Sequence, residues 1–292
     1  MASFGGHALP GALLIILSLL LTVEGVLIYY TRRPQFRCAS FIIVALATIG
    51  IMVELFWPVH PNEPPFGRLI KPGTDQWNKP MNWQHSTMYT FFFIYGAARL
   101  AASSSAVVLS DIDRLAGALA FGVEGYLFYN HVHGRSPLDT KIHLLIAFIC
   151  LGTALIFALS FFLEHRRKTF MMDMIISALV FAQGTWFWHV AFILYGPKPW
   201  IIDTHKHIMK RQHDNDMNHS MEENHMDAEH MDAMFAVLFF TWHVAFALFV
   251  IFVISFTIHK FLKKRDLLLA HPLDEECHEP LISRSCTISP NL

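Results

Sequence analysis

The sequence predicts an all-α fold: a bundle of seven transmembrane helices with a lumenal or extracellular N-terminus and a cytosolic C-terminus. Hydrophobic residues make up 54% of the 292 residues and charged residues only 15%, well below the usual quarter of a soluble domain. Seven apolar runs approach the roughly 20 residues that a spanning helix needs. Basic residues gather in alternate connections, and this pattern sets the direction of the spans.

Each predicted span follows from an apolar run that polar or turn-forming residues bound. The first run has no preceding basic residues and contains Glu24 toward its cytosolic end, which favours a retained span over a signal peptide. The third carries Arg99 near its middle, with Glu124 or Glu54 as its candidate partner. The fourth is the shortest, and the letters HGRSP end it. In chain order the spans are 8–30, 38–57, 82–109, 114–130, 138–163, 171–195 and 233–258.

The orientation follows from three basic connections, TRRPQFR, EHRRK and HKFLKKR, which come after the first, fifth and seventh spans. These connections lie on one side of the membrane, and the positive-inside rule makes that side cytosolic. The membrane domain therefore covers residues 1–265. The polar residues 266–292 are predicted to be a disordered cytosolic tail. Golgi, endolysosomal and plasma membranes all fit this orientation.

Composition excludes some classes of partner and leaves others open. The net charge of −1 gives no indication of nucleic-acid binding. Four scattered cysteines form neither a CxxC pattern nor a disulfide framework. The expected partners are membrane lipids, and a homo-oligomer stays open. No serine stands out as a nucleophile, so the sequence assigns no catalytic residue and leaves open whether the chain is an enzyme.

Six histidines from five spans are predicted to lie in the outer half of the bundle. Ionisable groups in a bilayer usually face the bundle interior and indicate function. Neutral imidazoles with nearby carboxylates are the ligands that zinc prefers, so zinc is the favoured ion, with copper as an alternative. The predicted ligands are His85, His131, His133, His143, His189 and His243.

Polar side chains near these histidines are candidate supporting groups. Glu124 lies seven residues before His131 and therefore shares its helical face. Two alternatives stay open: a haem held between histidines of facing helices, and a non-catalytic scaffold or trafficking protein whose histidines form hydrogen bonds or sense lumenal pH. The candidate supporting residues are His7, Glu54, Arg99, Glu124, Asn130 and Asp139.

The segment 203–232, between the sixth and seventh spans, is rich in histidine and methionine. Thioether and imidazole together suit copper, whereas imidazole with carboxylate suits zinc. A second interpretation is a polar loop with incidental histidines. The candidate metal ligands of this loop are His219, His225, His230, Met226 and Met231.

Several motifs resemble the transmembrane protein 45 family over roughly residues 4–260. They are FGGHALPG, WNKPMNWQHSTMYTFFF, VEGYLFYNHVHGRSPLDTKIHLL, QGTWFW and TWHVAF. The resemblance implies a seven-helix membrane bundle and no particular activity. The His/Met-rich loop reads as an insertion relative to the family, and His189 is the ligand candidate that the resemblance supports least. His7 belongs to the family pattern.

Overall fold

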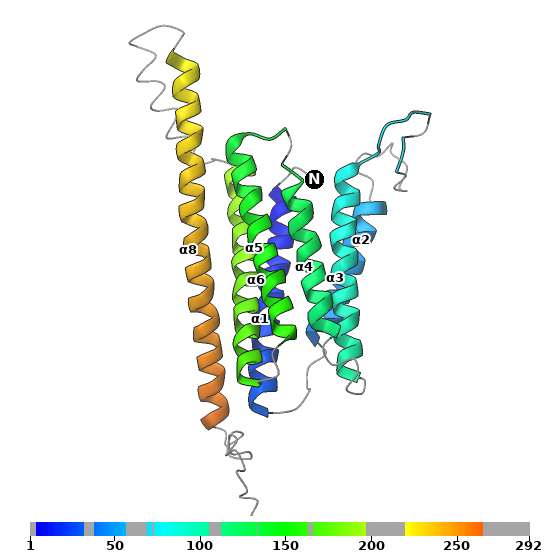
Figure 1. The fold of residues 1–292 in the computed structure, drawn as a ribbon, viewed down its shortest axis with the longest axis vertical. Coiled ribbons are helices and arrows are strands. Elements are labelled where there is room, and N and C mark those ends of the chain that lie inside the picture. Colours follow the sequence, from blue (N-terminus) through cyan, green and yellow to red (C-terminus); the bar gives the residue numbers. More distant parts are fainter. Residues whose placement is uncertain are drawn as a thin grey trace, which may run out of the picture.

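A computed structural model describes residues 4–31, 38–56, 69–71, 73–104, 112–132, 134–162, 166–196 and 220–264, and this part of the chain is largely helical (Figure 1). Of residues 220–230 only the backbone is described. The all-α prediction is confirmed. The described helices are α1 (Phe4–Thr31), α2 (Cys38–Phe56), α3 (Pro80–Ser104), α4 (Ile112–Tyr129), α5 (Pro137–Phe161), α6 (Arg166–Tyr195) and α8 (Ser220–Lys264).

Five of the described helices, α1, α2, α5, α6 and α8, are long and apolar enough to cross a membrane. The other two fall short because of their polar residues. Helix α3 opens with PMNWQHST, and the 18 residues of α4 include Asp113, Arg114 and Glu124. The count of seven spans and the direction of the termini therefore stay predictions.

The helices pack most closely in three pairs, α1 with α6, α4 with α5 and α2 with α3. Glycine allows the first pair to approach. A Cβ atom added to Gly184 of α6 would lie only 2.7 Å from the carbonyl oxygen of Gly11 of α1. Small residues at such crossings are typical of helix packing in membranes, where close van der Waals contact replaces the hydrophobic drive.

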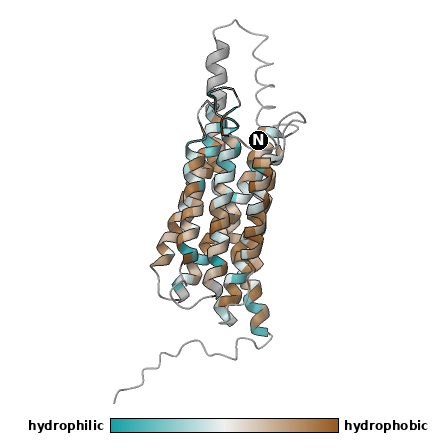
Figure 2. Ribbon diagram, turned by 90° about the vertical axis from the view of Figure 1, so that its right-hand side faces the viewer, coloured by the Kyte–Doolittle hydropathy of each residue, from teal (hydrophilic) through white to brown (hydrophobic). Residues whose placement is uncertain are grey.

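Helix α8 lies at one edge of the bundle and packs against α6, α5 and α1 (Figure 1). It begins at Ser220, so it includes 220–232 of the segment predicted as a loop. Its outer side carries the exposed aromatic residues Trp242, Phe249 and Phe252. Figure 2 shows hydrophobic colouring along the middle of the helices and more hydrophilic residues toward their ends. This is the pattern of a bundle that faces lipid.

Candidate functional site

Three of the predicted ligands meet at the end of the bundle that carries the start of α1 and the α4–α5 turn, which we call the histidine end. His85 comes from α3, His131 from the turn after α4, and His143 from α5. The ring centroids of His131 and His143 are 5.8 Å apart, and those of His85 and His131 are 6.4 Å apart. The ring of His7, on α1, lies 5.8 Å from that of His143. The structure therefore brings together histidines that are far apart in the sequence.

In both His85 and His131, the Nδ1 atom lies within hydrogen-bonding distance of a side-chain oxygen atom. The Nδ1 atom of His85 lies 3.0 Å from Oε1 of Glu54, on α2. The Nδ1 atom of His131 lies 2.8 Å from Oε1 of Gln84, on α3. A carboxylate only accepts hydrogen bonds and an amide oxygen likewise accepts, so in each neutral ring Nδ1 carries the proton. The Nε2 atom of both rings then carries the lone pair.

His143 has the same arrangement within its own helix. Its Nδ1 atom lies 2.8 Å from the carbonyl oxygen of Asp139 and 2.8 Å from the Oδ1 atom of that residue. Asp139 also pairs with Arg135 at 2.7 Å, and its backbone N–H donates to the N-cap Ser136. Pro137 follows in the first turn, where its missing N–H costs nothing. The start of α5 therefore positions both Asp139 and the ring of His143.

Electrostatics keep His131 neutral. Burial of the imidazole is the main cause of its lowered pKa, because burial disfavours the charged form. The positive charge of Arg135 and the neighbouring His143 and His85 lower the pKa further. Together they lower the pKa of His131 from 6.5 to about 4. A metal ion binds the neutral form of imidazole, so this ring is in the binding form throughout the physiological pH range.

The other two predicted ligands that the structure describes, His189 and His243, form a separate pair. The Nδ1 atom of His189, on α6, lies 2.8 Å from Nε2 of His243, on α8. The Nδ1 atom of His243 is 3.0 Å from the hydroxyl of Thr185. The buried indole of Trp186 contacts both rings and donates a hydrogen bond to the carbonyl of Ile142, on α5, next to His143. Trp186 therefore stands between this pair and the three histidines described above.

Some predicted residues contribute to neither group. His133 and His219 lie outside the described residues, as do the side chains of His225, His230 and Met226. Met231, on α8, is exposed, and the amide of Asn130 donates to the carbonyl of Tyr126 one turn earlier. Among the described residues, no three His, Cys, Asp or Glu side chains already stand close enough to hold a metal ion.

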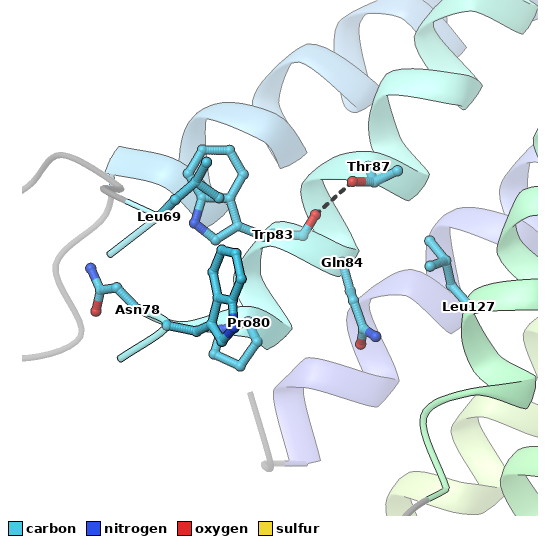
Figure 3. Close-up of a pocket in the computed structure, with 8 residues that line it drawn as sticks. Leu69, Asn78, Pro80, Trp83, Gln84, Thr87 and Leu127 are labelled. Atoms are coloured by element: carbon cyan, nitrogen blue, oxygen red, sulfur yellow. Dashed lines mark hydrogen bonds between the residues drawn. The ribbon is translucent and has the colours of Figure 1, made fainter. Parts of the chain in front are cut away.

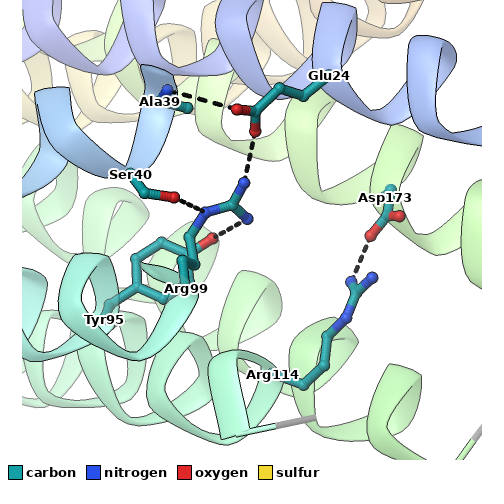
Figure 4. A network of polar contacts seen from close by, with 7 residues as sticks. All are labelled: Glu24, Ala39, Ser40, Tyr95, Arg99, Arg114 and Asp173. Atoms are coloured by element: carbon teal, nitrogen blue, oxygen red, sulfur yellow. Dashed lines mark hydrogen bonds and ion pairs between the residues drawn. The ribbon is translucent and has the colours of Figure 1, made fainter. Parts of the chain in front are cut away.

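Arg99 lies at the opposite end of the bundle, which we call the arginine end, and its partner differs from both expected carboxylates. Its Nη2 atom is 2.5 Å from Glu24, on α1, and its Nε atom donates to Ser40, on α2 (Figure 4). Glu24 is only 5% exposed, so it is a buried partner rather than an interfacial residue. Arg114 forms a second ion pair nearby, with Asp173 of α6.

A surface hollow of about 220 Å³ adjoins the three histidines. Trp77, Trp83 and Pro80 form much of its apolar lining, and Gln84 also lines it (Figure 3). Because Gln84 accepts the hydrogen bond from His131, the hollow lies one side chain away from the cluster. Sequence reasoning missed Gln84, although it stands directly before His85 in the motif NWQHS.

Comparison with known proteins relates the chain to a family and to a membrane protein. The sequence model of a family described as "Family of unknown function (DUF716)" matches residues 110–256, which include His131 and His143 but not His85. The chain is also similar to transmembrane epididymal protein 1A of Mus musculus, with 25% identity over 172 residues that cover 56% of this chain and 46% of the relative. The aligned region thus spans about half of that relative. Together with the apolar helices, this relative indicates an integral, multi-pass membrane protein.

Proposed function

The chain belongs to the DUF716 family, whose function is unknown, and from this premise we propose that it is a metal-binding membrane protein. His85, His131 and His143 are the proposed ligands, and zinc is the proposed ion. The motifs quoted above further favour membership of the transmembrane protein 45 family. The proposed topology has seven spans, with α3 and α4 completing the set, an outer histidine end and a cytosolic C-terminus.

The observation that carries this proposal is the common anchoring of the three rings. In each ring Nδ1 lies against an oxygen atom, from Glu54, Gln84 or Asp139. Histidines that bind a metal nearly always donate their second ring N–H to such an oxygen, because it fixes the tautomer and orients the ring. When neutral, these three imidazoles from three segments are therefore held in the tautomer that coordination through Nε2 requires.

The distances between the imidazole rings determine how far the rings must move to bind a zinc ion. Two imidazoles that share a tetrahedral zinc through bonds of about 2.0 Å have ring centroids about 5 Å apart. The observed separations are 5.8 Å and 6.4 Å. Within each of these two pairs, zinc binding therefore requires the rings to approach by roughly 1 Å, which small rotations about their side-chain bonds supply. A water molecule or His7 would take the fourth position of the tetrahedron.

Metal analysis of the purified full-length protein tests the proposal. We expect zinc in the wild type, and the double variant His131→Ala with His143→Ala should lose one equivalent per chain. The matched control is His189→Ala with His243→Ala, which removes two buried histidines from the other group and should keep that equivalent. Helical circular dichroism would show that each variant folds. A double variant that retains the full zinc content of the wild type would refute the assignment.

A scaffold without a bound metal is the second candidate. The observation that favours it is the pair His189 and His243, in which the rings form a hydrogen bond with each other and His243 forms another with Thr185. If His85, His131 and His143 also serve packing, the wild type contains no stoichiometric metal and His131→Ala lowers only stability. An absorption spectrum of the same sample tests haem, which would show an intense Soret band.

A further inference from the structure

A second polar site lies near the middle of the bundle, away from the three histidines. Glu124 of α4 is 6% exposed and Gln183 of α6 is fully buried. Among the described residues, the Oε2 atom of Glu124 and both amide atoms of Gln183 have no hydrogen-bond partner. A polar group that is buried without a hydrogen-bond partner loses its contacts with water and gains nothing in return, so it destabilises the fold. Such a cluster therefore points to something that the two side chains bind.

The groups around Glu124 are polar but carry no positive charge. Gln183 and the Cys150 thiol of α5 lie beside its carboxyl, although the Gln183 amide is not in hydrogen-bonding geometry. From α3, Tyr89 lies close enough to Glu124 and Glu54 for the charge of either carboxylate to act on its hydroxyl. The nearby described arginines already have partners, since Arg99 pairs with Glu24 and Arg114 with Asp173. A negative charge on Glu124 thus has no compensating cation among these neighbours.

Toward the arginine end, a layer of aromatic rings closes the site. Phe121 lies one turn from Glu124 on α4, and its ring centroid is 5.1 Å from that of Phe92 and 5.7 Å from that of Phe157. The rings of Tyr95 and Phe157 are 5.6 Å apart. All of them except Phe92 are almost fully buried. This layer separates Glu124 from the ion pairs of Arg99 and Arg114.

Toward the histidine end, polar groups continue from Glu124. Tyr89 lies near both Glu124 and Glu54, and the Oε1 atom of Glu54 is 3.0 Å from the Nδ1 atom of His85. The Oε2 atom of Glu54 also has no hydrogen-bond partner among the described side chains. Chains of carboxyl, hydroxyl and imidazole groups inside a membrane bundle are typical of proton relays. Among the described residues, the polar groups near Glu124 therefore continue toward the histidine end.

We propose that Glu124 and Gln183 form a binding site for an exchangeable proton and the water that delivers it, reached from the histidine end along Tyr89 and Glu54. Hydronium gives its proton to the Glu124 carboxylate, which forms a carboxylic acid and leaves water. The Gln183 amide suits both states, because its N–H₂ donates to the carboxylate and its oxygen accepts from the carboxylic O–H. This site does not depend on metal binding.

Infrared difference spectroscopy of the full-length protein in lipid nanodiscs tests this directly. Spectra in alkaline and acidic buffer should differ by the carbonyl band of a protonated carboxyl, which shifts in D₂O. We expect Glu124→Gln to remove that band. The matched control is Asp113→Asn, a substitution of another carboxyl of α4 that lies at the arginine end, beyond the aromatic layer, and it should keep the band. A band that does not respond to buffer pH, or one that persists in Glu124→Gln, would overturn the proposal.

A second variant keeps the proposal testable if Glu124→Gln does not fold. Gln183→Leu retains the carboxyl but removes both amide groups, so the midpoint of the band should move by about one pH unit or more. An unchanged midpoint would contradict the role of Gln183.

A separate experiment tests the aromatic layer by measuring proton entry into liposomes that contain the protein and a pH-sensitive dye. Liposomes with the wild-type protein should admit few protons, and those with Phe121→Ala should admit more. Equal proton entry with both proteins would refute closure of the site by this layer.

Discussion

The substitution Glu24→Gln tests the buried ion pair that joins three helices at the arginine end. Arg99 donates to Glu24 at 2.5 Å, to Ser40 at 3.2 Å and to Tyr95 at 3.4 Å. The amide keeps an acceptor at this position but removes the negative charge. Arg99 cannot give up its proton, so it would remain charged inside the bundle with only neutral partners.

The expected loss of stability follows from these contacts. Breaking a buried ion pair by removing one partner costs about 3–5 kcal/mol. The retained amide acceptor restores about 1 kcal/mol, so we expect Glu24→Gln to lower the free energy of unfolding by about 2–4 kcal/mol. This corresponds to a change of about 30- to 700-fold in the unfolding equilibrium constant.

The assay is reversible unfolding in mixed micelles with increasing sodium dodecyl sulfate, followed by helical circular dichroism. The control is the double variant Glu24→Leu with Arg99→Met, which removes both charges together and should lie within about 1–2 kcal/mol of the wild type. Most of that residual loss comes from the backbone N–H of Ala39, which donates to Glu24 at the start of α2. If the single variant is as stable as the wild type, or the double variant is the less stable of the two, the charge pairing does not hold these helices together.

Two further substitutions test packing and pH dependence. Gly184→Ala places a methyl group 2.7 Å from the carbonyl oxygen of Gly11 and should lower unfolding free energy by about 1–3 kcal/mol, whereas Gly152→Ala, with nothing within 4 Å, should not destabilise the bundle. Thermal unfolding of both variants measures the difference. The lowered pKa of His131 means that the unfolded chain binds the proton more readily, so stability should fall as pH drops from 6.5 to about 4. Unfolding measured across this range should be less dependent on pH in His131→Gln, and an unchanged slope would refute the assignment.

The depths and contacts of the candidate site residues could be predicted from the sequence only in part. The common depth of His85, His131 and His143 follows from counting alternate helix directions along the chain. The ion pair of Arg99 with Glu24 was not predicted, because Arg99 was placed near the middle of its span, where Glu54 and Glu124 were its candidate partners. The role of Gln84 was also hidden, since a glutamine beside a histidine indicates nothing until the rotation of α3 is known.

The sequence by itself determined that this is a helical membrane protein, because hydropathy is a local property and long apolar runs are stable in a bilayer only as helices. It also determined which residues would be costly inside that bundle. Only the tertiary structure decided how those residues pair: the packing and rotation of the helices, set in part by contacts such as Gly11 with Gly184, place His189 against His243 and put Trp186 between that pair and the other histidines. Helix rotation depends on many weak side-chain contacts at once, and no single stretch of sequence contains that information.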